Sequence, residues 1–270
     1  MRYNVYKDKN LIHFPIGKCA NVSQLWMAYE PENWDTFNDN NGGKRINLPE
    51  KDFERHVLDL NKTPEFNQEL IKRQYPNYFI SVFIRDPIKR FASGIAQDYD
   101  NLTIELENHE LILKHPNYIS DFDKRFAEFT KDPSLQNLNI LFKYKDARFS
   151  RHLAPQGVNT DYDNITKIGF DHLPENVEYF NVDQNLTQNY RHWLFENKLT
   201  KYQNTPKQGY IWHRNDASKI GRKKEIQDVV FKYIANSNTL LNWIYEYYAI
   251  DFEMYERLKP RCYSHKKTAP

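Results

Sequence analysis

Cysteine is scarce in this chain of 270 residues: only Cys19 and Cys262 occur, near opposite ends. Two distant cysteines make no disulfide framework, and no Cys/His spacing is typical of a zinc site. The usual carboxylate patterns of a catalytic metal site are not evident either. We therefore expect a fold that is held by its core rather than by cross-links, and no metal cofactor.

Long apolar runs, a signal peptide and a strong net charge are also missing. No apolar run approaches the roughly eighteen residues that a membrane-spanning helix needs, so we expect a soluble, cytoplasmic protein without a membrane span. The formal net charge of +2 argues against a broad electrostatic surface for nucleic acid. Because no repeat or linker divides the chain, we predict one domain over residues 1–258 and a frayed basic tail over 259–270.

Hydrophobic and aromatic residues are abundant. Hydrophobic residues make up 40% of the chain, and nineteen Tyr, seventeen Phe and five Trp are among them. A chain of this length can bury roughly three quarters of its unfolded surface. Most of the aromatic rings are expected in the core, although some could stack on an adenine or a sugar.

The stretch of residues 78–99 combines a buried strand, a turn and a helix. Residues 78–84 carry no charge and are rich in aromatic and β-branched side chains, as in a central strand. Asp86 can cap a helix, and Pro87 suits its first position because the fixed φ is helical and no N–H needs a partner. Arg85 therefore lies at the carboxyl end of the strand, where α/β sheets bind ligands and a helix N-terminus favours an anion.

Two further polar side chains follow on the predicted helix. Arg90 and Ser93 are three residues apart and share one face, so that Arg85, Ser93 and also Arg90 could surround one phosphate. Spacing alone allows an alternative, in which the turn is solvated and Asp86 forms a surface ion pair with Arg90.

A second strand–loop–helix is predicted nearer the N-terminus. A short strand at 11–14 leads into the loop PIGKCANVSQ and a helix that begins near Val22. Loop N–H groups, the helix N-terminus and Lys18 could converge on an anion. The loop is not a Walker A sequence, because Cys19 rather than Ser or Thr follows the lysine and the glycine spacing is absent. An ordinary turn between strand and helix is the alternative.

Together these segments resemble sulfotransferases. RDPIKRFAS, residues 85–93, is similar to the 3′-phosphate-binding motif R-x-P-x-x-R-x-x-S of the carbohydrate, membrane-associated branch of that family. The run of residues 70–94 resembles the same region over its whole length. The resemblance extends in the right order over roughly residues 10–256.

The loop near Lys18 is similar to the family's 5′-phosphosulfate loop. Lys18 matches its lysine and Ser23 its later hydroxyl. Two positions depart from the pattern: Gly17 stands where proline is usual before the lysine, and Val22 where threonine is common. The segment HRNDASKIGRKKEI resembles a late family segment that closes over the cofactor, although a solvated basic helix start is an equal alternative.

The resemblance implies a fold, a co-substrate and an acceptor. The fold is a three-layer, P-loop-like α/β arrangement with a central parallel sheet flanked by helices. The sulfuryl donor is 3′-phosphoadenosine 5′-phosphosulfate (PAPS), no metal is needed, and the acceptor is a carbohydrate or polysaccharide hydroxyl. A soluble bacterial or viral member fits better than an anchored Golgi enzyme. The implied cofactor-binding residues are Lys18, Cys19, Ala20, Asn21, Val22, Ser23, Arg85, Arg90, Ser93, Asn215 and Ser218.

Sulfuryl transfer needs a cation near the leaving group and a base near the acceptor. We expect Lys18 to stabilise the charge that grows on the leaving phosphate. A histidine suits the base near neutral pH. The first candidate is His56, on an amphipathic stretch at 52–60 that we predict as a helix, because related glycosaminoglycan enzymes place a catalytic histidine between the two cofactor motifs. The second is His152 in the segment RHLAPQ; either histidine could instead be a packing or surface residue.

Two other functions stay open. A nucleotide-dependent phosphotransferase would need a Walker lysine before Ser or Thr and a magnesium carboxylate, and neither is visible. A catalytically weak or inactive binding protein on the same fold is favoured by Gly17 and Val22. The oligomeric state is open as well.

The rest of the chain supplies ordinary elements. A polar, turn-rich surface loop is expected over residues 30–50. We predict helices at 65–74 and 118–129, a strand at 177–182 followed by a helix, and two helices at 226–234 and 239–258.

Overall fold

The structure, a computed structural model, divides into two compact units. The sheet unit comprises residues Met1–Asp86, Gln156–Arg214 and Glu253–Pro270, and the helical unit comprises Pro87–Pro155 and Asn215–Phe252. The prediction of a single domain over 1–258 stays a prediction. The described residues are 2–16, 19, 24, 27–29, 36–38, 44–46, 50–59, 61–96, 170–200 and 222–265.

The sheet unit is built on five strands in the order β5-β1-β2-β6-β7. β2, β6 and β7 pair in parallel, whereas β1 is antiparallel to both of its neighbours. Four of these five strands therefore run in the same direction, which agrees with the predicted α/β sheet. Their bounds are β1 Arg2–Tyr6, β2 Leu11–Phe14, β5 Phe53–Val57, β6 Phe79–Ile84 and β7 Val177–Asn181.

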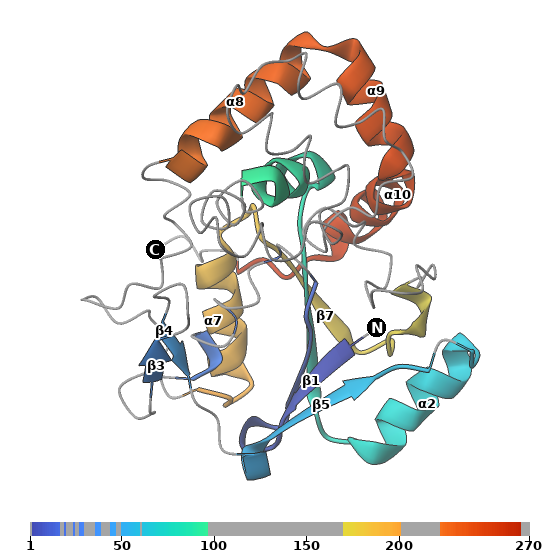
Figure 1. Cartoon of the computed structure of the whole chain (residues 1–270). Coiled ribbons are helices and arrows are strands. Elements are labelled where there is room, and N and C mark those ends of the chain that lie inside the picture. The colour runs from blue at the N-terminus through green and yellow to red at the C-terminus, as the bar shows by residue number, and fades with distance from the viewer. Residues whose placement is uncertain are drawn as a thin grey trace, which may run out of the picture. The chain divides into compact units, whose positions relative to one another are not determined.

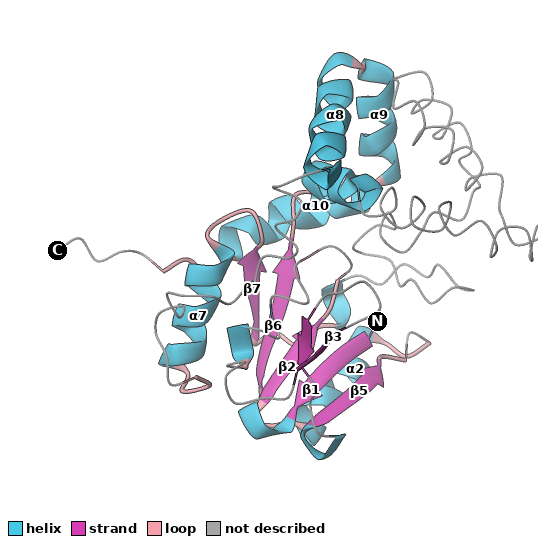
Figure 2. Cartoon of the chain, turned by 60° about the vertical axis from the view of Figure 1, so that its left-hand side comes forward, coloured by secondary structure: helices cyan, strands magenta, loops and turns pink. Residues whose placement is uncertain are grey.

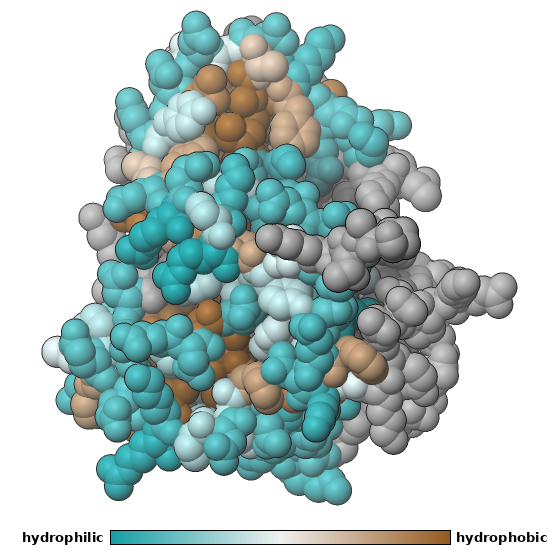
Figure 3. Space-filling model, turned by 180° about the vertical axis from the view of Figure 1, so that it is seen from behind, coloured by the Kyte–Doolittle hydropathy of each residue, from teal (hydrophilic) through white to brown (hydrophobic). Residues whose placement is uncertain are grey.

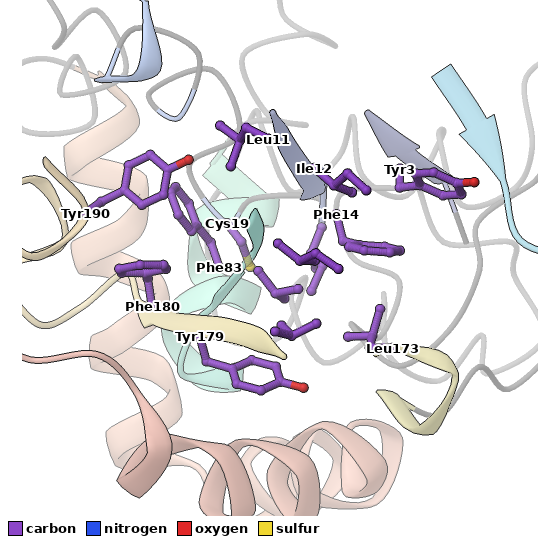
Figure 4. Packing of buried hydrophobic residues seen from close by; sticks show 14 of the residues in the cluster. Tyr3, Leu11, Ile12, Phe14, Cys19, Phe83, Leu173, Tyr179, Phe180 and Tyr190 are labelled. Atoms are coloured by element: carbon purple, nitrogen blue, oxygen red, sulfur yellow. The ribbon is translucent and has the colours of Figure 1, made fainter. Parts of the chain in front are cut away.

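The central strand β6 is buried on both faces, as its uncharged sequence predicts. Alternate side chains point to opposite faces of a sheet, so Ser81 and Phe83 share one face and Val82 lies on the other. Helix α7 (Leu186–Glu196) covers the first face through Tyr190 and Trp193. Figure 4 shows Phe83 and Tyr190 close together within this cluster.

The opposite face is covered by α2 (Pro64–Gln74) and the end of α10 (Ala249–Leu258). Helix α2 begins where predicted, because the Thr63 side chain accepts a hydrogen bond from the Phe66 N–H and Pro64 starts the helix. Figures 1 and 2 show α7 and α2 on opposite sides of the strands. The sheet unit is thus a layered α/β structure, as expected.

Two parts of the sheet unit correct the sequence-based predictions. Residues 53–57 form β5 rather than a helix, because they pair along β1, a strand that was not predicted. The expected surface loop at 30–50 contains a short hairpin, in which β3 (Thr36–Asn38) pairs with β4 (Lys44–Ile46).

The prediction of a frayed tail is wrong for residues 259–265. The N–H of Tyr263 donates to the Tyr179 carbonyl of β7 at 2.8 Å, and its hydroxyl lies 2.7 Å from Nδ1 of His192 on α7. The N–H of His265 donates to the Asn189 side chain at 3.1 Å. This segment therefore packs along β7 and α7; residues 266–270 lie outside the described part.

The helical unit has a core of its own. It contains a helix at 87–96, α8 (Arg222–Asn236), α9 (Asn238–Tyr247) and the first residues of α10. Phe91 packs against Trp243 and Tyr248 at its centre. The single helix predicted over 239–258 is two helices, since the backbone leaves helical geometry at Tyr248.

The surface seen from behind is mainly hydrophilic, and hydrophobic side chains show through in a few places (Figure 3). In the described part of the chain, no helix is both long and apolar enough to cross a membrane.

Candidate functional site

The carboxyl ends of β2, β6 and β7 lie next to each other because these strands pair in parallel. Phe14 pairs with Val82, and Ile84 pairs with Asn181, so the chain leaves all three strands at the same edge of the sheet. In open α/β sheets the crevice outside this edge binds ligands. We therefore take it as the candidate site and refer to it as the carboxyl edge.

Arg85 is the first residue after β6, and an acidic side chain holds it. Its Nε lies 3.5 Å from Oδ1 of Asp183, two residues beyond β7. The other carboxylate oxygen of Asp183 accepts a 3.1 Å hydrogen bond from the N–H of Asp86. The Asp183 side chain is only 11% exposed, whereas that of Arg85 is 21% exposed. The Arg85 side chain is thus held at the carboxyl edge and stays partly exposed there.

Asp183 is itself held by Asn181 and, through it, by α10. The Asn181 side-chain oxygen accepts a 3.0 Å hydrogen bond from the N–H of Asp183, and its amide group donates to the Tyr255 hydroxyl at 3.0 Å. Burial raises the pKa of Tyr255, and the charges of Asp86 and Asp183 add to that rise. Tyr255 therefore stays neutral near pH 7, and the carboxylate is placed by groups that do not ionise there.

The predicted motif continues into the helix at 87–96. The helix begins at Pro87 as predicted, and Arg90 and Ser93 are both buried, with 2% and 9% of their surface exposed. Within the helical unit, the charge of Arg90 acts on Tyr247, whose pKa burial raises to about 12. Arg90 therefore belongs to the interior of that unit. That Ser93 and Arg90 contact a phosphate stays a prediction.

Of the predicted phosphosulfate loop, the structure describes Cys19. This residue is fully buried, its N–H donates to the Ile16 carbonyl at 3.1 Å, and Figure 4 shows it within the hydrophobic cluster. Its side chain therefore packs in the core. The other loop residues lie outside the described part of the chain: Lys18, Ala20, Asn21, Val22 and Ser23.

A buried polar network connects the residue after that loop with the sheet. The Gln24 side chain accepts a hydrogen bond from the Tyr6 hydroxyl at 3.3 Å and donates to the Tyr190 hydroxyl at 3.1 Å. Tyr190 lies 3.4 Å from the Ser81 hydroxyl, which lies 3.0 Å from Nδ1 of His13. We refer to these five residues as the interior network. It fixes Gln24, at the end of the predicted loop, to three strands and to α7.

His56 lies on the edge strand β5, in a charged cluster on the α2 side of the sheet. Its Nε2 is 3.1 Å from Oε2 of Glu54 and 3.0 Å from the Tyr75 hydroxyl, and its ring stacks on Tyr3 with centroids 5.1 Å apart. Glu54 also pairs with Lys7. Lys7 and then His56 lower the pKa of Glu54 to about 2. We refer to Lys7, Glu54, His56 and Tyr75 as the edge cluster.

The edge cluster is separate from Arg85. Strands β1 and β2 lie between β5 and β6, so three strand spacings, or about 14 Å, separate β5 from β6 across the sheet. The His56 side chain is 35% exposed and points to the same face as Tyr3. His56 therefore has an accessible imidazole with a carboxylate partner, but no contact with the residues of the carboxyl edge is seen among the described side chains.

The remaining predicted site residues, His152, Asn215 and Ser218, lie outside the described part of the chain. Among the residues that are described, no group of three or more His, Cys, Asp or Glu side chains is arranged to hold a metal ion.

Sequence reasoning missed Asp183, Asn181 and Gln24 as site-supporting residues. For Asp183 a signal existed, since it follows a predicted buried strand just as Arg85 does. For Gln24 there was none, because a glutamine in a helix is ordinarily solvated and its partners Tyr6 and Tyr190 are far away in the sequence.

Comparison with protein-family models gives a match over residues 1–256 to a model described as the Sulfotransferase family. A search of curated proteins found no match, and a search of solved structures found none.

Proposed function

Because this chain belongs to the sulfotransferase family, we propose that it transfers the sulfuryl group of PAPS to a hydroxyl of a carbohydrate. Membership of the sulfotransferase family supports sulfuryl transfer in general. The choice of donor rests on the motif that begins at Arg85, and the choice of acceptor rests on the resemblance of that motif to the carbohydrate branch.

One observation carries the proposal: Arg85 is held at the carboxyl edge with its side chain 21% exposed. An arginine binds a phosphate through paired N–H donors, and such charge-assisted bonds are roughly twice as strong as neutral ones. Arg85 at this edge therefore fits an anionic ligand. Arg85 is the proposed ligand of the 3′-phosphate, and Ser93 stays the second ligand that the motif predicts.

Lys18 is proposed to act on the leaving group. A fixed cation beside the bridging oxygen gains interaction energy as negative charge grows there, and this lowers the barrier specifically. Gln24 supports this role indirectly, because the interior network fixes the chain one residue beyond Ser23.

His56 is proposed as the base that accepts the proton of the acceptor hydroxyl. The Glu54 carboxylate lies beside Nε2, which favours the tautomer with hydrogen on that nitrogen and leaves Nδ1 able to accept a proton. The stack on Tyr3 keeps the ring in one orientation. His152 is the alternative base from the sequence.

The proposal is tested first by turnover. PAPS is offered with a panel of glycans, peptides and small alcohols, and sulfated products are read by mass spectrometry. We expect a sulfated glycan, with a rate that EDTA leaves unchanged. Binding of PAPS without any turnover would identify the non-catalytic binding protein instead, and a magnesium requirement would favour a phosphotransferase.

The donor site is tested by calorimetry with two nucleotides. Arg85→Ala should weaken binding of adenosine 3′,5′-diphosphate by about 2 kcal/mol or more, since a charge-assisted contact is lost. Adenosine 5′-phosphate, which lacks the 3′-phosphate, should be affected much less. Equal losses for both nucleotides would refute the assignment of Arg85.

A further inference from the structure

We propose that Asp183 is a positioning residue, which orients the Arg85 guanidinium for an anionic group of the ligand. The inference rests on the proposed function and adds to it a residue outside the motif. Asp183 follows β7, whereas Arg85 follows β6, so nothing in the spacing of the chain connects the two.

The contacts of Asp183 show how it could act on Arg85. One carboxylate oxygen lies 3.5 Å from Nε of Arg85, and the other accepts the N–H of Asp86 at 3.1 Å. The same side chain therefore contacts the guanidinium and fixes the backbone of the next residue. A guanidinium carries five N–H donors, so a contact at Nε leaves the four N–H groups of the two terminal nitrogens for a phosphate.

The position of Asp183 is itself determined by rigid surroundings. Its N–H is bonded to the buried Asn181 side chain, whose amide group reaches Tyr255 on α10. The carboxylate is also largely buried, with 11% of its side chain exposed. A long side chain such as arginine loses considerable rotamer freedom when a ligand fixes it. If Asp183 already holds the Arg85 side chain in the free protein, less rotamer entropy is lost when the ligand binds.

A carboxylate beside a phosphate site could act in the opposite way. As a competing counter-ion it would repel the ligand and attract the arginine away from it. If Asp183 positions Arg85, removing its charge should weaken phosphate binding. If Asp183 competes with the ligand, removing its charge should strengthen phosphate binding. A binding measurement therefore tests the inference.

The experiment measures binding of adenosine 3′,5′-diphosphate and adenosine 5′-phosphate to the full chain by calorimetry. Asp183→Asn removes the charge and one acceptor, and Asp183→Glu keeps the charge but moves it. If Asp183 positions Arg85, both variants bind the 3′,5′-diphosphate about tenfold more weakly, because binding must then order the arginine side chain. Binding of the 5′-phosphate should change less than twofold.

Tighter or unchanged binding of the 3′,5′-diphosphate by Asp183→Asn would overturn the inference in favour of a competing charge. Equal weakening of both nucleotides would overturn it in favour of a purely structural role. Gln184→Ala, at the exposed next position, is the matched control and should bind like the wild type. If Asp183→Asn fails to fold, Asp183→Glu still decides between the outcomes.

Failure of the proposed function looks different. In that case the wild type itself does not distinguish the two nucleotides, or Arg85→Ala weakens the binding of both by the same factor and leaves the distinction intact. When the wild type distinguishes them and Arg85→Ala abolishes the distinction, the result with Asp183 tests positioning only.

Discussion

The two faces of the central sheet use polar side chains in opposite ways. The interior network under α7 joins hydroxyls, an amide and an imidazole, all buried, through Tyr6, Gln24, Tyr190, Ser81 and His13. The edge cluster on the α2 side joins charged groups whose side chains are 35% to 41% exposed at Glu54, His56 and Lys7. Because the interior network is buried, losing one of its hydrogen bonds should lower the free energy of unfolding considerably. Because the edge cluster is partly exposed, a similar loss there should lower it little, and a substrate could reach these side chains.

The largest expected effect concerns catalysis at the edge cluster. His56→Ala should lower kcat by roughly a hundredfold to ten-thousandfold, the usual range for a lost general base. Binding of PAPS should be unchanged, and the free energy of unfolding should change by about 1 kcal/mol or less, since the side chain is partly exposed. Steady-state kinetics and urea unfolding measure the two quantities.

His152→Ala is the control for that prediction, expected to raise the acceptor KM more than it lowers kcat. The opposite pattern would exchange the roles of the two histidines. A loss of only a fewfold in both variants would mean that neither histidine is the base.

The next largest effect concerns stability on the α7 face. Phe83 is fully buried, with ring centroids 4.8 Å from Tyr190 and 5.8 Å from Phe180. Phe83→Ala should lower the free energy of unfolding by about 3–5 kcal/mol, through lost transfer energy and the cavity left behind. Phe66→Ala on α2, where the side chain is 50% exposed, should cost below about 1 kcal/mol in the same urea titration. Similar losses for both would contradict the packing described here.

Deleting one tyrosine hydroxyl on each face compares the two faces at the level of a single atom. Tyr190→Phe leaves the Gln24 amide and the Ser81 hydroxyl each without one buried partner, and should cost about 1–3 kcal/mol. Tyr75→Phe deletes the same atom in the edge cluster, where solvent can replace it, and should cost below about 1 kcal/mol. Chemical denaturation of the two variants measures both losses in free energy of unfolding. A larger loss for Tyr75→Phe than for Tyr190→Phe would contradict the comparison of the two faces.

The smallest effect is a dependence of stability on pH. Lys7 and His56 lower the pKa of Glu54 from 4.5 to about 2. Stability from this group is therefore present above about pH 4.5 and is lost as the pH falls toward about 2. Because the pair is exposed, Glu54→Gln should cost below about 1 kcal/mol at pH 7 and nothing near pH 2. Glu69→Gln, an exposed carboxylate on α2, is the control.

Strands with strong local patterns were predictable. The uncharged run at 78–84 became β6, and the segments at 11–14 and 177–182 became β2 and β7. The start of the following helix at Pro87 followed from the fixed φ of proline. In each case the information lies within a few neighbouring residues.

Strands that depend on a distant partner were not predictable. β5 lacks the alternation of a half-buried strand, since Glu54, Arg55 and His56 stand in a row, and the pairing with β1 supplies the reason for its conformation. The support for Arg85 comes from Asp183, which is far away in the chain and follows a different strand. Local propensity carries no signal for such contacts, so the motif singled out Arg85 but not the group that holds it.

The backbone bond from Tyr263 to Tyr179 bears on how an edge of the sheet is closed. β7 is the last strand of the five-stranded sheet, and that bond occupies an outward-facing carbonyl of its edge. An uncovered strand edge is a template for pairing with other chains. Residues 259–265 therefore act as a cover, and a version of the chain cut after Leu258 should expose this edge and become prone to self-association as its concentration rises.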